Sequence, residues 1–118
     1  MPRQVLIVED DLAFVALIQL ALKDLDFEFH VARDGRQALE LLPQRPYDLL
    51  IADYRLPHVD GVEIAKATVQ RWPGCQIILI SATRGGEISR HLKNLPIVGF
   101  IEKPFSPIQF RELVVKAQ

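Results

Sequence analysis

The sequence predicts an α/β fold in which five β-strands form one parallel sheet. Short apolar runs alternate along the chain with longer segments of helical pattern. Most of the short runs are apolar at consecutive positions, which is typical of parallel strands buried on both faces. The chain has 118 residues, of which 49% are hydrophobic and 25% are charged, so it is long enough to bury a core. We therefore expect a single domain, residues 1–118, of alternating strands and helices.

The first three elements are expected to be two strands separated by a helix. Val5–Val8 is an apolar run that ends directly before three acidic residues. Leu12–Leu22 follows as a helix in which nearly every residue is apolar, whereas a surface helix usually carries a polar stripe. Phe27–Val31, which contains two phenylalanines and a valine, is the second strand candidate.

The later elements follow the same alternation. Asp34 precedes a helical pattern at Gly35–Leu42, and Asp60 precedes another at Gly61–Trp72; aspartate is a favoured N-cap residue. A proline directly after each segment helps to end the helix. Leu49–Ala52 lies between them as the third strand. The last elements are a strand at Ile77–Ile80, a weakly patterned helix at residues 87–93, a strand at Ile97–Ile101, and a helix that begins after Ser106 with Pro107 in its first turn.

The composition excludes several classes of protein. With a formal net charge of −1 and a pI near 6.3, the chain has no basic excess to attract nucleic acid or anionic lipids, so we expect no direct nucleic-acid binding by this segment. The single cysteine, Cys75, excludes an internal disulfide and fits a reducing cytoplasm. No apolar stretch reaches the roughly 18 to 20 residues of a membrane-spanning helix, and no signal peptide is recognisable. We expect a cytoplasmic protein that does not bind membranes.

Polar residues follow the predicted strands at their carboxyl ends, where binding sites form in open parallel sheets. Asp53 follows the third strand, Ser81 the fourth, and Lys103 lies just beyond the fifth. The first strand is followed by Glu9, Asp10 and Asp11. Two like charges 4 Å apart at an effective dielectric near 20 cost on the order of 4 kcal/mol, so such a cluster needs a counter-cation. Mg²⁺, which prefers oxygen ligands and binds one or two carboxylates together with a phosphoryl oxygen, is the cofactor that we expect.

The same residues suit phosphoryl transfer, which asks for little beyond an aligned nucleophile and neutralised charge. Lys103 supplies a positive charge for a phosphoryl group, and Ser81 supplies a hydroxyl donor. Asp53 stands at the centre of the predicted sheet edge. We therefore expect Asp53 to be the nucleophile and to become an acyl phosphate.

Four motifs at these strand ends carry a family resemblance. They are V-E-D-D at 8–11, D-Y-R-L-P-H-V-D-G at 53–61, S-A at 81–82 and F-I-E-K-P-F at 100–105. In this order they resemble a bacterial response-regulator receiver domain of the CheY-like superfamily, and the resemblance covers essentially the whole chain. It implies a flavodoxin-like (βα)5 three-layer sandwich whose parallel strands have the order 2-1-3-4-5. It also implies a part in a two-component phosphorelay, with a histidine kinase or phosphotransfer protein as the phosphoryl donor.

The resemblance further assigns a part to each motif residue. Glu9 and Asp10 match the acidic pair that binds Mg²⁺, and Arg55 stands where a backbone carbonyl completes the metal shell. Asp53 matches the phosphorylated aspartate, and Lys103 matches the phosphate-binding lysine. Ser81 matches the switch hydroxyl, and Phe100 matches the switch aromatic. A Lys103–Pro104 peptide bond in the cis form is expected in such a fold. Phosphorylation is expected to draw Ser81 inward, to let Phe100 follow, and so to change the surface of the fourth helix, fifth strand and fifth helix.

The chain departs from the commoner family pattern at three positions. Ser81 stands where threonine is commoner, and Phe100 stands where tyrosine is common, yet a phenylalanine can still swing inward on apolar burial alone. Arg55 lies two residues beyond Asp53, a position at which, as the resemblance implies, side chains border the path of the attacking water. We predict that Arg55→Ala changes the lifetime of phospho-Asp53 more than it changes Mg²⁺ binding.

The apolar helix at Leu12–Leu22 has two explanations that the sequence leaves open. It is either packed more deeply than a surface helix, or it carries an interaction patch, because exposed apolar patches usually mark interfaces. Members of the family resemble one another in using the start of this helix to dock on the kinase. Leu12, Phe14 and Val15 are the residues that we expect in a kinase-docking patch or a homodimer face.

Two functions from other classes remain as alternatives. An aspartyl-phosphate phosphohydrolase would use the same carboxylates, metal and lysine, but Arg55 stands where such an enzyme has its general acid, and the chain has no substrate cap. A receiver-like scaffold that binds partners without phosphorylation would need a broken acceptor set, yet Asp10, Asp53 and Lys103 are all present. We expect a signalling acceptor, not an enzyme beyond self-phosphorylation and self-dephosphorylation. An output domain or partner protein is implied, and the sequence leaves open which one.

Overall fold

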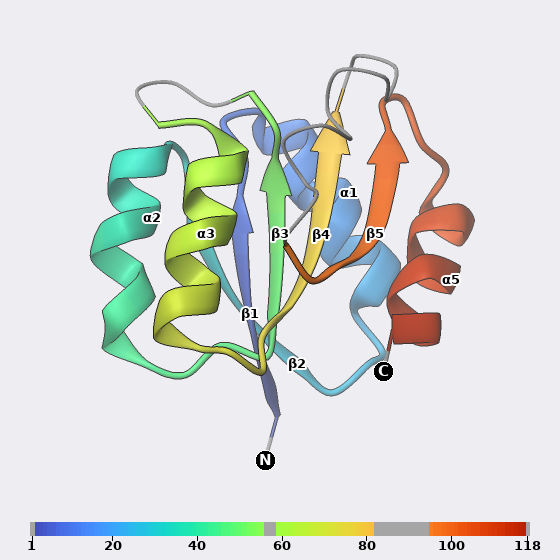
Figure 1. The fold of residues 1–118 in the computed structure, drawn as a ribbon. Coiled ribbons are helices and arrows are strands. Elements are labelled where there is room, and N and C mark those ends of the chain that lie inside the picture. The colour runs from blue at the N-terminus through green and yellow to red at the C-terminus, as the bar shows by residue number, and fades with distance from the viewer. Residues whose placement is uncertain (1, 56–58, 82–94, 118) are drawn as a thin grey trace.

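A computed structural model describes residues 2–55, 59–81 and 95–117 of the chain. Its centre is a five-stranded sheet in which all neighbouring pairs are parallel and the strand order is β2-β1-β3-β4-β5. In Figure 1 all the strand arrows point to the same edge of the sheet. The strands are β1 (Arg3–Val8), β2 (Phe27–Ala32), β3 (Leu49–Asp53), β4 (Gln76–Ser81) and β5 (Ile97–Glu102).

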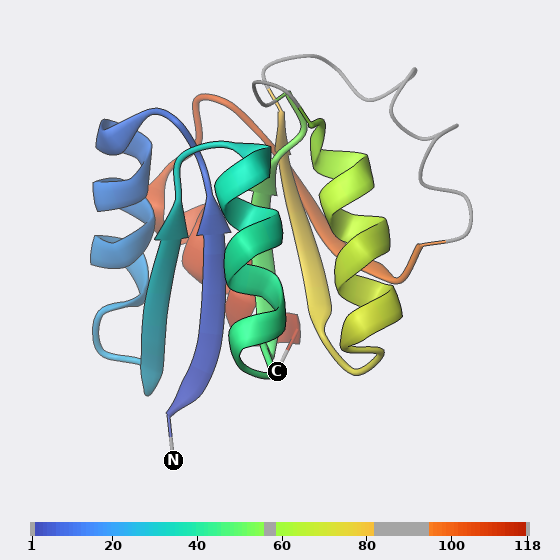
Figure 2. The same cartoon turned by 90° about the vertical axis from the view of Figure 1, so that its left-hand side faces the viewer.

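Helices cover both faces of the sheet and give the molecule three layers (Figures 1 and 2). One face carries α1 and α5, and the other carries α2 and α3. Their bounds are α1 (Leu12–Leu22), α2 (Gly35–Leu41), followed by a short 3-10 turn at Leu42–Gln44, α3 (Gly61–Arg71) and α5 (Pro107–Ala117). None of the helices in the described ranges is long and apolar enough to cross a membrane.

The central strands are apolar over most of their length because each packs against helices on both faces. Along β1, Val5 and Ile7 belong to the core beneath α1 and α5, whereas Leu6 and Val8 belong to the core on the α2 and α3 side. This alternation follows from the two-residue period of a strand. Every residue of β3 is buried, while the edge strands β2 and β5 are only partly buried.

The predicted fold class, strand order and three-layer arrangement are confirmed. The strand ends differ by a residue or two, because Asp53 and Ser81 still pair with neighbouring strands and so belong to β3 and β4. Asp11, Asp34 and Asp60 each accept a hydrogen bond from a backbone N–H in the first turn of α1, α2 and α3, respectively. The helix expected at residues 87–93 lies outside the described residues.

Helix α1 has a buried and an exposed face, and both are apolar. Val15 and Ile18 are buried against the sheet, whereas Leu12 and Leu20 are 55% and 58% exposed. The helix is therefore not buried on all sides, and the expectation of unusually deep packing is wrong for it. Apolar residues on the outer face are compatible with the interaction patch, which stays a prediction.

Candidate functional site

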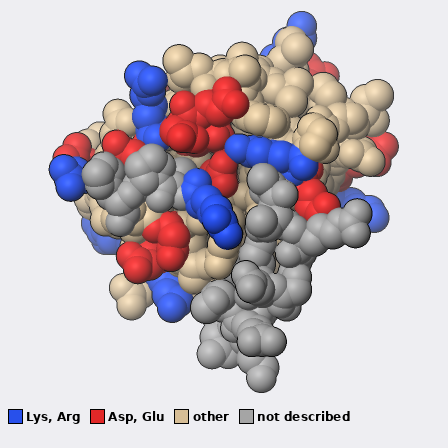
Figure 3. Space-filling model, turned by 90° about the horizontal axis from the view of Figure 1, so that it is seen from above, with Lys and Arg blue, Asp and Glu red and all other residues tan. Residues whose placement is uncertain are grey.

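Charged residues from three strand ends converge at the carboxyl edge of the sheet. Figure 3 looks down on this edge and shows acidic and basic side chains next to one another. Glu9 directly follows β1, Asp53 is the last residue of β3, and Lys103 directly follows β5. Glu9 is fully buried and Asp53 is 7% exposed, so both carboxylates lie in an environment where charge needs a partner.

Lys103 supplies that partner for both carboxylates. Its Nζ lies 2.6 Å from Oδ2 of Asp53 and 2.9 Å from Oε2 of Glu9, and its side chain is 14% exposed. Ion pairs this close and this shielded from water are much stronger than surface pairs. The lysine therefore links the ends of β1, β3 and β5 into one charged site.

Each buried carboxylate also accepts a hydrogen bond from the backbone two residues further along the chain. The Arg55 N–H donates to Oδ1 of Asp53 at 3.0 Å, and the Asp11 N–H donates to Oε1 of Glu9 at 3.1 Å. Asp11 in turn accepts a hydrogen bond from the Ala13 N–H and caps α1, so its carboxylate has a structural role. These local turns hold the second oxygen of each functional carboxylate toward Lys103.

The environment of Glu9 raises the pKa of its carboxyl group. Burial raises its pKa from the usual 4.5 to about 7, although Lys103 and the Asp11 N–H act in the opposite direction. Burial acts to lower the pKa of Lys103, but the contacts with Asp53 and Glu9 outweigh it and raise that pKa overall. The site at neutral pH thus combines a firmly charged ammonium with a carboxyl group close to its titration point.

Three carboxylates at this edge suit a hard divalent cation. One oxygen from each of Glu9, Asp10 and Asp53 lies within 4.8 Å of the others, and Asp10 is exposed to solvent. Oε2 of Glu9 is buried and, apart from its ion pair with Lys103, has no hydrogen-bond partner in the part of the chain that the structure describes. All-oxygen donors with room for waters on the exposed side match the preference of Mg²⁺.

Helix α3 begins directly against the backbone of Asp53. A Cβ on Gly61 would lie 2.4 Å from the Asp53 carbonyl oxygen and 2.9 Å from the Tyr54 Cα, closer than side chains can approach. The Gly61 N–H also donates to the Tyr54 carbonyl at 2.9 Å. Only glycine allows this approach, so Gly61 fixes the chain that carries the central carboxylate.

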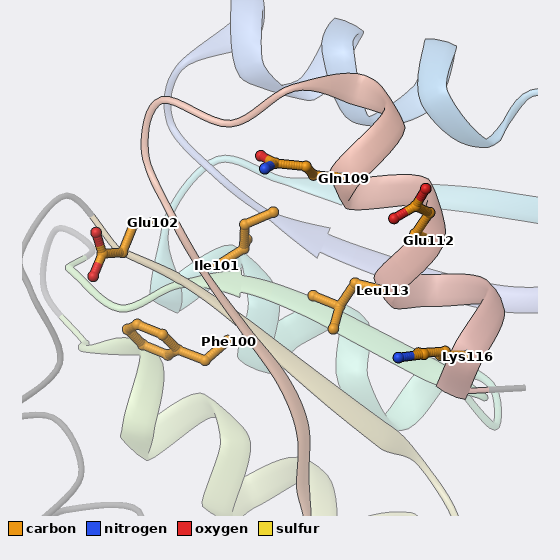
Figure 4. Close-up of a pocket in the computed structure, with 7 residues that line it drawn as sticks. All are labelled: Phe100, Ile101, Glu102, Gln109, Glu112, Leu113 and Lys116. Carbon is orange, nitrogen blue, oxygen red and sulfur yellow. The ribbon is translucent and has the colours of Figure 1, made fainter.

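The expected switch residues lie on β4 and β5, close to the same edge. Ser81 is 1% exposed and pairs with Glu102, while Phe100 pairs with Leu79 and is half-buried. Phe100 and Leu113 both line a pocket of about 390 Å³ at β5 and α5, but the Phe100 ring points away from α5, toward the core on the α2 and α3 side (Figure 4). Ser81 is thus within the sheet beside the charged site, and Phe100 is two residues away on the neighbouring strand.

The three residues expected to form a docking patch have different environments. Leu12 is 55% exposed, Phe14 is half-buried, and Val15 is 6% exposed in the core. Because Val15 faces the sheet, it cannot form part of an exposed patch, and the expectation for it is wrong. Phe14 lies beneath Lys103, which the sequence did not indicate, since nothing in an all-apolar helix marks which residue faces a distant lysine.

The sequence of the chain is similar to that of a known family and of several response regulators. Residues 5–115 match the family described as the response regulator receiver domain. The response regulator protein PilR of Pseudomonas aeruginosa is 30% identical over 115 residues, and the transcriptional regulatory protein SrrA of Staphylococcus aureus is 31% identical over 125 residues. These matches cover 98% and 100% of this chain but 26% and 47% of the two relatives, so the chain spans half or less of their length.

Solved structures show the same fold. A CheY-like response regulator receiver domain protein from Methanospirillum hungatei has a TM-score of 0.90 at 23% identity, with 99% of this chain and 94% of that chain covered. The signal receiver domain of an HD domain-containing protein from Pseudomonas fluorescens has a TM-score of 0.89 at 26% identity, with the same coverage.

Proposed function

The chain belongs to the response regulator receiver domain family, and from this premise we propose that it accepts a phosphoryl group on Asp53 in a two-component phosphorelay. The observation that carries the proposal is the contact of Lys103 with Asp53, at 2.6 Å, inside a cluster of acidic residues at the carboxyl edge of the sheet. A buried carboxylate with one oxygen held by the backbone and the other beside an ammonium is an aligned and charge-matched nucleophile.

In the proposed reaction, an Asp53 oxygen attacks the phosphorus of a phosphohistidine on a histidine kinase or phosphotransfer protein. The new O–P bond makes an aspartyl phosphate while the N–P bond breaks, and the leaving imidazole keeps the electron pair and takes up a proton. Lys103 then faces a phosphoryl oxygen in place of a carboxylate oxygen, which keeps its charge paired.

Glu9, Asp10, Asp53 and the backbone carbonyl of Arg55 would hold Mg²⁺ at this edge. When bound, the ion supplies positive charge that offsets the charge of the transferring phosphoryl group. Its fit rests on the three carboxylate oxygens within 4.8 Å of one another.

The proposed output is a change of the surface that includes β5 and α5. A phosphoryl group on Asp53 attracts the Ser81 hydroxyl, and Phe100 fills the space that this movement leaves. A shift of this kind needs the phosphorylated state to favour one arrangement by a few kcal/mol, which charge-assisted hydrogen bonds provide. The partners would be a cytoplasmic kinase and an output domain or partner protein, and Leu12 on α1 would contribute to kinase docking.

The direct test is incubation of the chain with acetyl phosphate and Mg²⁺, followed by intact-protein mass spectrometry. We expect a mass gain of one phosphoryl group, no gain when Mg²⁺ is chelated before the donor is added, and no gain in Asp53→Asn. Steady release of inorganic phosphate from a range of phosphomonoesters would instead indicate a phosphohydrolase. The absence of any mass gain in the unsubstituted chain would indicate a scaffold.

A further inference from the structure

A row of three aromatic rings lies beneath Lys103. The Lys103 Nζ is 4.3 Å from the centre of the Phe14 ring. The Phe14 and Phe105 ring centres are 5.7 Å apart and tilted by 40°, and the Phe105 and Phe110 rings are stacked at 5.2 Å. Phe110 is fully buried and Phe105 is 7% exposed, so the row is anchored in the core between α1 and α5. The ring nearest the lysine therefore has a fixed place.

The geometry is that of a cation–π contact. A cation over a ring face within about 6 Å of the centre is attracted by the negative face of the ring quadrupole, and the attraction strengthens when the cation is shielded from water. The Lys103 side chain is 14% exposed, so it meets this condition. The contact comes in addition to the ion pairs with Glu9 and Asp53.

We propose that Phe14 is a positioning residue for phosphoryl transfer, because its ring face holds the Lys103 ammonium beside the Asp53 carboxylate. The proposal rests on the function proposed above. A lysine has a flexible four-carbon stem, and its ammonium is a compact charge without a fixed direction. The ring restricts that charge to one place and uses none of its three N–H donors.

This property matters when the phosphoryl group arrives. Lys103 has to redirect an N–H donor from a carboxylate oxygen to a phosphoryl oxygen, and Glu9 or Asp53 then loses a contact. Attraction to a ring face depends weakly on rotation of the N–H bonds, so the contact with Phe14 persists while the donors exchange. A leucine at position 14 would fill much of the same space but would not attract the ammonium.

Stepwise fluorination of the Phe14 ring tests this inference, because fluorine weakens the negative ring face while the shape changes little. Phenylalanine and its mono-, di- and trifluorinated forms are incorporated at position 14 of the full chain, and the Mg²⁺-dependent rate of phosphorylation by acetyl phosphate is measured. We expect the logarithm of the rate to fall with each fluorine, to a total loss of about threefold to tenfold. Phe14→Leu should lose as much, and Phe14→Trp should retain the rate.

The control is the same fluorination series at Phe27, which lies at the start of β2, at the opposite edge of the sheet, where it contacts Phe29. Thermal unfolding of each variant checks that the fold is kept. Equal rates along the Phe14 series in a chain that is phosphorylated would overturn this inference alone. If the unsubstituted chain takes up no phosphoryl group, the proposed function is overturned together with it.

Discussion

Glu9 and Asp10 are neighbours in the sequence but occupy opposite environments. Glu9 is fully buried and paired with Lys103, whereas Asp10 is exposed. The chain turns out of the sheet directly after β1, so one side chain points into the site and the next faces solvent. From composition alone the two acids look interchangeable, and only the three-dimensional position shows that Glu9 is buried beside Lys103 and that Asp10 is exposed.

The raised pKa of Glu9 makes the stability of the metal-free protein depend on pH. Between the usual value of 4.5 and the folded-state value of about 7, the folded chain holds a proton that the unfolded chain has lost. The contribution of Glu9 to the free energy of unfolding is therefore highest below about pH 4.5. It falls as the pH rises through 7, by about 3 kcal/mol at most. Glu9→Gln should lack this fall.

Denaturant unfolding of both chains in a chelator, at several pH values between 5 and 8, measures the effect. The difference in unfolding free energy between Glu9→Gln and the unsubstituted chain should grow in favour of the glutamine variant as pH rises. A difference that stays constant over this pH range would contradict the raised pKa of Glu9.

The backbone and the side chain of Arg55 have separate roles at the site. Its backbone N–H holds Oδ1 of Asp53, while its side chain is exposed beside the site. Arg55→Ala keeps the backbone contact and removes only the cation. We expect the lifetime of phospho-Asp53 to shorten by about threefold, since the side chain shields the phosphoryl group from water. A threefold faster hydrolysis corresponds to an activation free energy that is lower by about 0.65 kcal/mol.

Mg²⁺ affinity of the same variant should change less than the phosphate lifetime, because the metal-holding oxygens are untouched. Decay of the phosphorylated protein is followed by intact mass spectrometry after removal of the donor, with Arg33→Ala on the loop after β2 as the control. An unchanged decay rate would remove the shielding role.

At the scale of elements, the contact between β3 and α3 connects the fold to the site. The pattern Asp60-Gly61 predicts a helix start, and the structure adds the reason for the glycine, because the Asp53 carbonyl lies where a Cβ would be. A single sequence contains no signal for such a contact between a strand and the helix that follows it.

Gly61→Ala should therefore disturb both stability and reactivity. The added methyl group must push α3 away from the Asp53 carbonyl, at a cost of about 1–3 kcal/mol or more. The shift of the Asp53 backbone should also slow phosphorylation by acetyl phosphate. Gly74→Ala is the matched control, since a Cβ at Gly74 meets nothing within 4 Å.

Unfolding midpoints and phosphorylation rates of the two glycine variants decide the matter. We expect both the unfolding midpoint and the phosphorylation rate to fall in Gly61→Ala, and we expect neither quantity to change in Gly74→Ala. Equal stability of the two variants would mean that α3 moves freely relative to β3.

The strands and α1 also show which structural features the sequence pattern predicts and which it does not. The central strands β1, β3 and β4 are predictable because burial on both faces gives each of them a run of at least four consecutive apolar residues. The bounds of α1 are predictable as well, but its buried face is not, since its apolar residues lie on a buried and an exposed face alike and no pattern of polar residues distinguishes the two. For that reason the sequence does not indicate that Val15 faces the sheet.

At the scale of the whole molecule, topology accounts for most of what the sequence predicts about the site. Parallel strands bring their carboxyl ends to one edge, so residues 9, 53 and 103 meet although they are far apart in the chain. What topology does not predict is which side chains touch within that edge. The ring of Phe14 beneath Lys103 and the burial of Glu9 depend on side-chain packing across several elements.

The central claim, that Asp53 accepts the phosphoryl group, is tested most directly by locating the modification. The chain is treated with acetyl phosphate and Mg²⁺, the acyl phosphate is reduced with borohydride, and the modified residue is identified by peptide mass spectrometry. We expect a reduced side chain at Asp53 alone, and no reduced side chain when Mg²⁺ is left out. Modification at Glu9 or Asp10, or at no residue in a folded chain, would contradict it.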